Sequence, residues 1–142
     1  KRALLPDQAI WEIEQGMALT AMDVQRASAI RSRWFAKAAE LFHRYDALVL
    51  PTAQCWPFPV QWSHPETISG QAMDTYHRWM EVVVPASLTG LPALGVPAGF
   101  GPGGLPMGLQ IIGGYRNDLH VLRLGHAWHQ ATGWPARNPP QT

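Results

Sequence analysis

The sequence predicts an α/β fold in which helices flank a β-sheet that contains an antiparallel hairpin. Three observations support this prediction. Residues 1–45 hold more than half of the charged side chains, and their apolar residues recur every three or four positions, which is typical of amphipathic helices. A short apolar run, 46–52, is closed by a proline, as a buried strand would be. Two further apolar stretches, 93–100 and 105–112, are joined by a glycine-rich turn, which indicates a hairpin.

The length and composition fit one globular domain or less. The chain has 142 residues, of which 46% are hydrophobic and 15% charged, and its formal net charge is +1. Because the basic residues are scattered, we expect no nucleic-acid partner. The single cysteine, Cys55, excludes an internal disulfide and favours a reducing compartment, so we expect a cytoplasmic protein. The first residues contain neither Met nor a signal-like apolar core, so we expect the chain to begin inside a longer protein.

The charged part, 1–45, is predicted to form two helices. Asp7 is the expected N-cap of a short helix that runs to about Met17. Thr20 and Asp23 have the spacing of a capping box, with Asp in place of the usual Glu, at the start of a longer helix. An amphipathic membrane helix would need a more one-sided basic face. The longer helix should instead pack one apolar side on a core; that side is Ala27, Ile30, Trp34, Ala38, Leu41 and Tyr45.

The segment between the first strand and the hairpin is predicted to be a loop and a helix. The stretch 53–70 has no regular period, but it is rich in aromatic residues, so we expect it to cover another part of the protein. Residues 73–88 form a third helical candidate. Pro85 should kink this helix or end its regular part, and Gly90 should stop it.

Residues 82–115 form a stretch of 34 residues without an Asp, Glu, Lys or Arg, so we expect them to be buried. A transmembrane helix is the obvious alternative, but five prolines and nine glycines in this stretch argue against it.

Glycines weaken a strand interior, which leaves two interpretations of the hairpin glycines open: close approach of a ligand or backbone for function, or tight packing of a helix on the sheet. Alternation places Leu94, Val96, Ala98 and Phe100 on one face with Leu105, Met107, Leu109 and Ile111, and Gly95, Pro97, Gly99, Pro106 and Gly108 on the other.

A last helix is expected from Asn117, as N-cap, to Gly133, and a polar tail follows it. This helix carries three histidines, His120, His126 and His129, but no carboxylate or cysteine stands at ligand spacing, so we predict no metal site. Cys55 has no evident base partner, and none of the five serines lies in a G-x-S-x-G motif. The residues alone therefore predict neither a cofactor nor a nucleophile.

Four segments follow one another along the chain: DALVLPT at 46–52, SLTGLPALGVPAGF at 87–100, GLPMGLQIIG at 104–113, and the final helix. In this order they closely resemble the C-terminal part of the amidase signature family. The resemblance covers about residues 20–138. Two positions depart from the family pattern: Ser87 stands where the family usually has Asn, and Gly95 where it usually has Ser.

The resemblance implies a cofactor-independent hydrolase of carboxamides with a single α/β domain built on a large mixed sheet. Residues 1–142 would be the C-terminal segment of that domain, divided into a helical part (1–45), a part with the strands, pocket loop and terminal helix (46–134), and a tail (135–142). In the family, a lysine activates a nucleophilic serine through a second serine with a cis peptide bond, and these residues lie upstream. This chain has only two lysines, Lys1 and Lys37, and no adjacent serines. We therefore assign it no catalytic residue and expect it to be inactive alone.

The resemblance also implies a substrate-binding wall, and the residues that would form it are Thr52, Trp79, Met80, Val83 and Ser87. The glutamyl-tRNA amidotransferase branch of the family has an acidic residue near the position of Met80, so Met80 argues against that branch. An apolar wall favours an aromatic or aliphatic amide, because a buried charged group would lack a partner. The alternative is that Trp79 and Met80 are ordinary core residues of an amphipathic helix.

The expected partner of the intact enzyme is a small-molecule amide, with no nucleic acid and no membrane involved. We expect this segment to leave apolar surface that is covered by self-association or by the missing N-terminal part of the same protein. The second hypothesis for function is a stand-alone, non-catalytic binding or regulatory module derived from the amidase fold.

Overall fold

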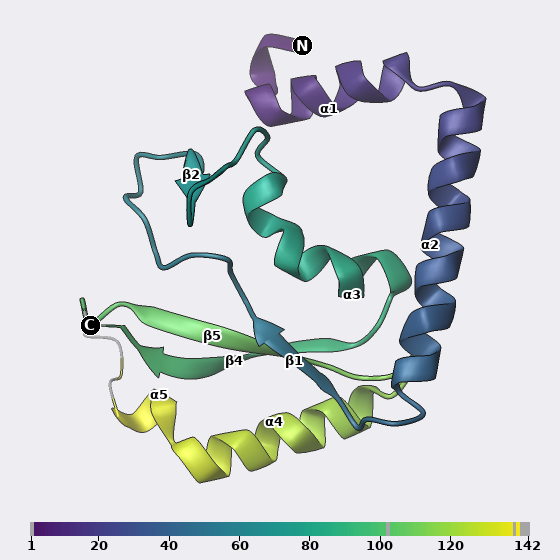
Figure 1. The fold of residues 1–142 in the computed structure, drawn as a ribbon. Coiled ribbons are helices and arrows are strands. Elements are labelled where there is room, and N and C mark those ends of the chain that lie inside the picture. Colours follow the sequence, from purple (N-terminus) through teal and green to yellow (C-terminus); the bar gives the residue numbers. More distant parts are fainter. Residues whose placement is uncertain (1, 102, 138, 140–142) are drawn as a thin grey trace. The chain divides into compact units, whose positions relative to one another are not determined.

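A computed structural model describes residues 2–101, 103–137 and 139, and Figure 1 shows the order of the elements. The chain divides into two compact units, 1–36 and 37–142, which are described separately. The elements are η1 (Arg2–Leu4), α1 (Asp7–Ala18), α2 (Ala21–Leu41), β1 (Leu48–Pro51), β2 (Thr67–Ile68), β3 (Gln71–Ala72), η2 (Arg78–Val83), α3 (Val84–Thr89), β4 (Ala93–Phe100), β5 (Pro106–Ile112), α4 (Asp118–Thr132) and α5 (Trp134–Arg137).

The first unit contains α1 and most of α2. The N-cap of α1 is Pro6, in an extended conformation, so the prediction that Asp7 caps this helix was wrong. Asp7 is instead in the first turn, where its negative carboxylate interacts favourably with the positive end of the helix dipole. The capping box is confirmed: the Thr20 N–H donates to Asp23 Oδ2 at 3.0 Å, and the Asp23 N–H donates to Thr20 Oγ1 at 3.2 Å. The end of α2 belongs to the second unit, and because α2 stops at Leu41, the predicted helical stripe does not extend to Tyr45.

The second unit is built on a three-stranded sheet with the order β1-β5-β4, in which β5 is the middle strand (Figure 1). Both pairings are antiparallel: Leu48 pairs with Ile112, and Leu94 pairs with Ile111. The hairpin is confirmed: β4 spans residues 93–100, as predicted, and β5 begins at Pro106, one residue later than predicted. Glycines in the connecting turn allow this reversal, and Gly104 has a positive φ of 72°.

A β-bulge in β4 changes which residues share a face. The register shifts between Pro97 and Gly99, so Gly99 pairs with Met107 and Phe100 pairs with Pro106. Paired residues share a face, and the prediction that Phe100 lies on the same face as Leu94 and Val96 was therefore wrong.

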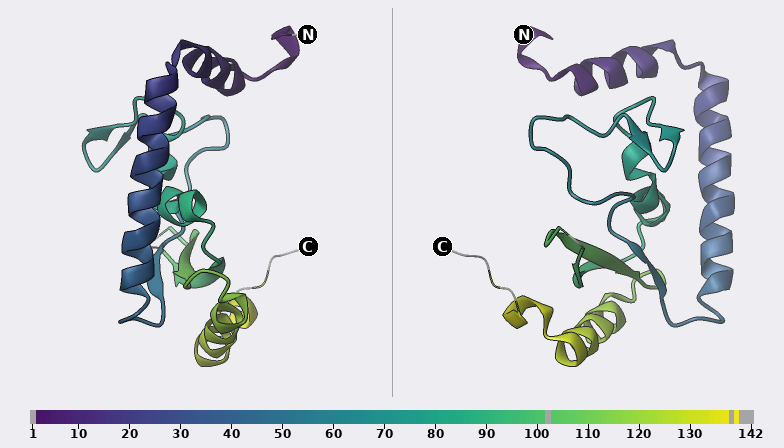
Figure 2. Two further views of the ribbon diagram at one scale, coloured as in Figure 1. Left: turned by 90° about the vertical axis from the view of Figure 1, so that its right-hand side faces the viewer. Right: turned by 60° about the vertical axis from the view of Figure 1, so that its left-hand side comes forward.

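Helix α4 lies against one face of the sheet, and η2 and α3 lie on the other side (Figures 1 and 2). The core under α4 contains Val96, Ile111 and Val121. Helix and sheet approach closely here, because a Cβ added to Gly125 would lie 2.2 Å from Leu94 Cδ2. Gly133 ends the helix in the left-handed conformation, as predicted. Among the described residues, no helix is both long and apolar enough to cross a membrane.

The segment before the hairpin differs from its prediction at two places. The expected loop ends in a small β2–β3 ribbon, and the Met73 N–H donates to the Glu66 carbonyl at 2.8 Å to continue that ribbon. Helical structure therefore begins at Arg78 rather than at Met73. Pro85 lies in the first turn of α3, where its missing N–H has no helical partner to lose, and Gly90 ends α3 with φ of 62°. The first three residues of the predicted tail, 135–137, belong to α5, while 138 and 140–142 lie outside the described residues.

Candidate functional site

The residues predicted to form the substrate-binding wall lie on three pieces of the chain. Thr52 follows β1, whereas Trp79, Met80 and Val83 belong to η2 and Ser87 to α3. Ser87 Oγ donates to the Val83 carbonyl at 3.2 Å. The Ser87 hydroxyl hydrogen is thus used within the helix, and its oxygen remains able to accept.

The side chain of Thr52 explains one glycine of the hairpin. A Cβ added to Gly108 would lie 2.7 Å from Thr52 Oγ1, whereas one added to Gly95 would lie 3.9 Å from Thr52 Cγ2, which is an ordinary van der Waals contact. The Thr52 N–H also donates to the Gly108 carbonyl at 3.0 Å, which extends the pairing of β1 with β5 by one residue. The close approach considered for this face is therefore made by a side chain of the same protein.

The side-chain amide of Gln110 connects the end of β1 to η2. Gln110 is 5% exposed. Its Nε2 donates to the carbonyl of Pro51 at 2.8 Å and to the carbonyl of Val82 at 3.0 Å. The Thr52 side of the site is thereby joined to the Trp79 side by a single buried group.

A second glutamine, Gln54, makes a similar connection from the loop after β1. Its Nε2 donates to the Arg78 carbonyl at 3.3 Å, and its Oε1 accepts from the Val82 N–H at 2.9 Å. Sequence reasoning missed both glutamines. The available signal for Gln110 was its position as the one amide in an otherwise apolar strand, whereas Gln54 lies in a polar loop and gave no signal.

Aromatic side chains surround Trp79 on the loop side. The Phe58 ring lies 5.4 Å from that of Trp79, edge to face, and the Tyr76 ring lies 6.3 Å from it. Trp62 stacks on Phe58 at 6.4 Å. The Trp79 Nε1 atom is buried and has no hydrogen-bond partner among the described residues. Trp79 is thus held by ring contacts, and its indole N–H is left with hydrogen-bonding capacity.

The loop after β1 covers the tip of the hairpin, which confirms that its aromatic residues cover another part of the protein. A Cβ added to Gly101 would lie 2.8 Å from the Trp56 ring. Cys55, beside it, is partly buried, and this burial raises the pKa of its thiol. A raised pKa lowers the thiolate fraction at neutral pH, which argues against a nucleophilic role.

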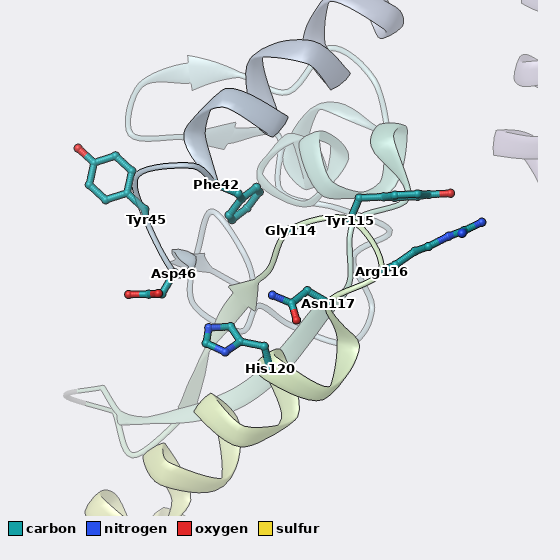
Figure 3. Close-up of a pocket in the computed structure, with 8 residues that line it drawn as sticks. All are labelled: Phe42, Tyr45, Asp46, Gly114, Tyr115, Arg116, Asn117 and His120. Carbon is teal, nitrogen blue, oxygen red and sulfur yellow. The ribbon is translucent and has the colours of Figure 1, made fainter.

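A cavity of about 360 Å³ lies at the opposite end of β1 from Thr52 (Figure 3). Tyr115 and Arg116 point away from Asn117 and His120 in this view, and the Arg116 guanidinium lies 5.2 Å from the Tyr115 ring centre. His120 Nε2 is buried without a hydrogen-bond partner in the described part of the chain. None of the five predicted wall residues is among those that line the cavity, which are Phe42, Tyr45, Asp46, Gly114, Tyr115, Arg116, Asn117 and His120.

Metal ligation finds no support in residues 2–101, 103–137 and 139, because no three His, Cys, Asp or Glu side chains there are grouped to hold an ion. A second cavity, of about 670 Å³, is lined by loop residues from Trp62 to Thr67 and also contains none of the predicted wall residues.

Comparison with known proteins identifies the family. Residues 1–122 match the family model described as Amidase. The chain belongs to the amidase signature family. This amidase segment is similar to a glutamyl-tRNA(Gln) amidotransferase subunit of Dehalococcoides mccartyi, with 34% identity over an alignment of 119 residues; the match covers 75% of this chain and 23% of that protein. It is also 57% identical to the corresponding protein of Ralstonia nicotianae over 53 residues, and this alignment covers 37% of this chain and 11% of that protein.

Solved structures match the amidase segment over most of its length. A bacterial aryl acylamidase of the amidase signature family superposes with a TM-score of 0.84 and 28% identity, covering 98% of this chain and 30% of that one. The glutamyl-tRNA(Gln) amidotransferase subunit of Thermotoga maritima gives a TM-score of 0.64 and 28% identity, covering 86% and 25%. The chain therefore spans less than a third of the length of these relatives.

Proposed function

We propose that the chain is the C-terminal part of an amidase that hydrolyses the C–N bond of carboxamides, giving an acid and ammonia or an amine. Membership of the amidase family, matched over residues 1–122, carries this proposal. The reaction implied by the family proceeds through attack of a serine on the amide carbonyl, departure of the amine with a proton, and hydrolysis of the acyl-enzyme by water.

The catalytic serine pair and lysine of the proposed enzyme lie outside residues 1–142. Two features of the chain support this: its lysines are only Lys1 and Lys37, and no two of its serines are adjacent. An acyl-transfer site needs a nucleophile, a base and oxyanion donors, so residues 1–142 alone would not turn over an amide. Their role would be to supply scaffold and one wall of the substrate pocket.

The proposed substrate is an aromatic or aliphatic amide without a charged group near the wall. Trp79, Met80 and Val83 offer a substrate no opposite charge, and a buried ion left unpaired would be costly. Glu81 is the acidic residue next to this wall, but its carboxylate faces Arg78 Nε at 3.3 Å and its side chain is 58% exposed. The proposal therefore places the enzyme outside the amidotransferase branch.

The test uses the intact polypeptide whose sequence includes residues 1–142. Release of amine or ammonia is measured with three amides of similar size: an aromatic one, an aliphatic one and one that carries an ammonium group. We expect turnover of the first two and little of the third, and added hydroxylamine should divert the acyl group to a hydroxamate. Binding of amides without turnover would instead support the non-catalytic module and overturn the proposal.

A further inference from the structure

We infer that Gln54 and Gln110 are positioning residues that hold the substrate-binding wall of η2 against the end of β1, and that they thereby set the affinity for large amides. This inference rests on the proposed function. The side chains of the two glutamines make four hydrogen bonds, and all four are to main-chain atoms. The glutamines therefore hold the main chain that carries the wall and not the side chains of the wall.

Val82 is the residue on which both amides converge. Its N–H donates to Gln54 Oε1 at 2.9 Å, and its carbonyl accepts from Gln110 Nε2 at 3.0 Å. In a 3₁₀ helix a carbonyl accepts from the N–H three residues ahead, but three residues after Val82 the chain has Pro85, which has no N–H. Gln110 supplies a donor that the 3₁₀ pattern of η2 cannot supply at this carbonyl.

The same amides fix the position of the wall relative to Thr52. Gln110 Nε2 also donates to the carbonyl of Pro51, the residue before Thr52, and Gln54 reaches back to the Arg78 carbonyl at the start of η2. Trp79, Met80 and Val83 lie between or beside the main-chain groups that are held in this way. A displacement of Val82 would therefore move the wall as a unit.

This arrangement requires a primary amide at position 110, because one nitrogen atom must donate two hydrogen bonds. The two N–H groups of Gln110 donate to two carbonyl oxygens. An ionised carboxylate at the same place would instead put a negatively charged oxygen against these carbonyl oxygens, which also carry negative partial charge. Burial raises the pKa of such a carboxyl, and once protonated it can donate one of the two bonds. Gln110→Glu should therefore weaken the wall at high pH and partly restore it at low pH.

The experiment compares variants of the intact amidase on two substrates. Gln110→Glu should raise the KM for a large aromatic amide about tenfold at pH 8, with recovery toward the wild-type ratio at about pH 5. The kcat/KM for acetamide, which has only a methyl group to place against the wall, should stay within about twofold of wild type at both pH values. Gln130→Glu, which adds the same charge at an exposed position of α4, should leave both substrates unchanged.

The outcomes separate this inference from the proposed function. If Gln110→Glu lowers kcat/KM for both amides equally and in proportion to the folded fraction, its role is structural and the inference is overturned. If the variant does not fold, Gln54→Met removes two of the four hydrogen bonds without adding charge and should show the same selective rise in KM. An active wild type with unaltered glutamine variants overturns the inference alone, whereas a wild type inactive on every amide overturns the proposed function.

Discussion

The indole Nε1 of Trp128 in α4 donates a hydrogen bond to the main-chain carbonyl of Pro97 in β4 at 2.8 Å. Pro97 is the last β4 residue in regular register before the bulge that ends at Gly99. A bulge leaves main-chain groups without a partner in the ladder, so a donor from the covering helix compensates for the irregularity. The bond thus fastens α4 to the sheet at the point where strand pairing is interrupted.

Trp128→Phe keeps most of the ring but removes this donor. We expect the free energy of unfolding of the intact amidase, measured by urea denaturation, to fall by about 0.5–1.5 kcal/mol. Trp62→Phe is the control, because Trp62 is 55% exposed in the loop. An equal loss in both variants would argue that ring size, and not the bond to Pro97, determines the effect.

Two glycine-to-alanine changes in helices should have opposite signs. At Gly125 an added Cβ would lie 2.2 Å from Leu94 Cδ2, so Leu94 must move and the free energy of unfolding should fall by about 1–3 kcal/mol. At Gly16 in α1 nothing lies within 4 Å, and alanine should be stabilising by up to about 1 kcal/mol through its helix propensity. Thermal denaturation of both variants tests the contrast, which fails if they shift the midpoint in the same direction.

The capping box predicts a pH dependence at the start of α2. Hydrogen bonds from the Thr20 hydroxyl and then from the Thr20 N–H hold the pKa of Asp23 below its ordinary value of 3.8. Because the pKa is lowered in the folded state, the contribution to stability is fully present above that ordinary value and is lost as the pH falls through the lowered one. A carboxyl-carbon NMR titration should report a low midpoint for Asp23, and Thr20→Val should bring it up toward 3.8. An unchanged midpoint in that variant would contradict the assignment.

Met80 should control which amides the intact enzyme accepts. Met80→Asp is expected to lower kcat/KM for an aromatic amide about tenfold or more, because a carboxylate replaces an apolar surface. The same variant should gain activity on an amide that carries an ammonium group. Met22→Asp adds the same charge at a side chain that is 68% exposed and should change neither substrate. Loss of activity on all amides without a gain on the cationic one would identify Met80 as a core residue instead.

Local chemistry made much of the fold predictable. The hairpin strands, the helix stops at Gly90 and Gly133, and the capping box at Thr20 each depend on residues close in sequence. The β2–β3 ribbon was missed because it has only two residues per strand, too few for a period to be recognised.

The parts of the site that were not predicted depend on distant groups. Gln110 finds its two acceptors 28 and 59 residues away along the chain, and only the folded sheet brings them together. The bulge near Gly99 likewise follows from tertiary packing: Gly99 has φ of +126°, and a Cβ there would lie 3.2 Å from the Trp134 ring of α5. Alternation alone could not reveal that shift. The role of the five predicted wall residues remains a prediction for the intact enzyme.

The strand order β1-β5-β4 also has a consequence for how the chain folds. Strands β4 and β5 are neighbours in sequence and can pair after a small loss of chain entropy, whereas β1 must close a much longer loop to reach β5. The segment that carries η2 and α3 lies inside that longer loop. Gln110 Nε2 joins the Val82 carbonyl of this segment to the Pro51 carbonyl of β1, and this connection is complete only after β1 has paired. The region around Trp79 should therefore be the last part of this sheet assembly to become rigid and the first to loosen on unfolding.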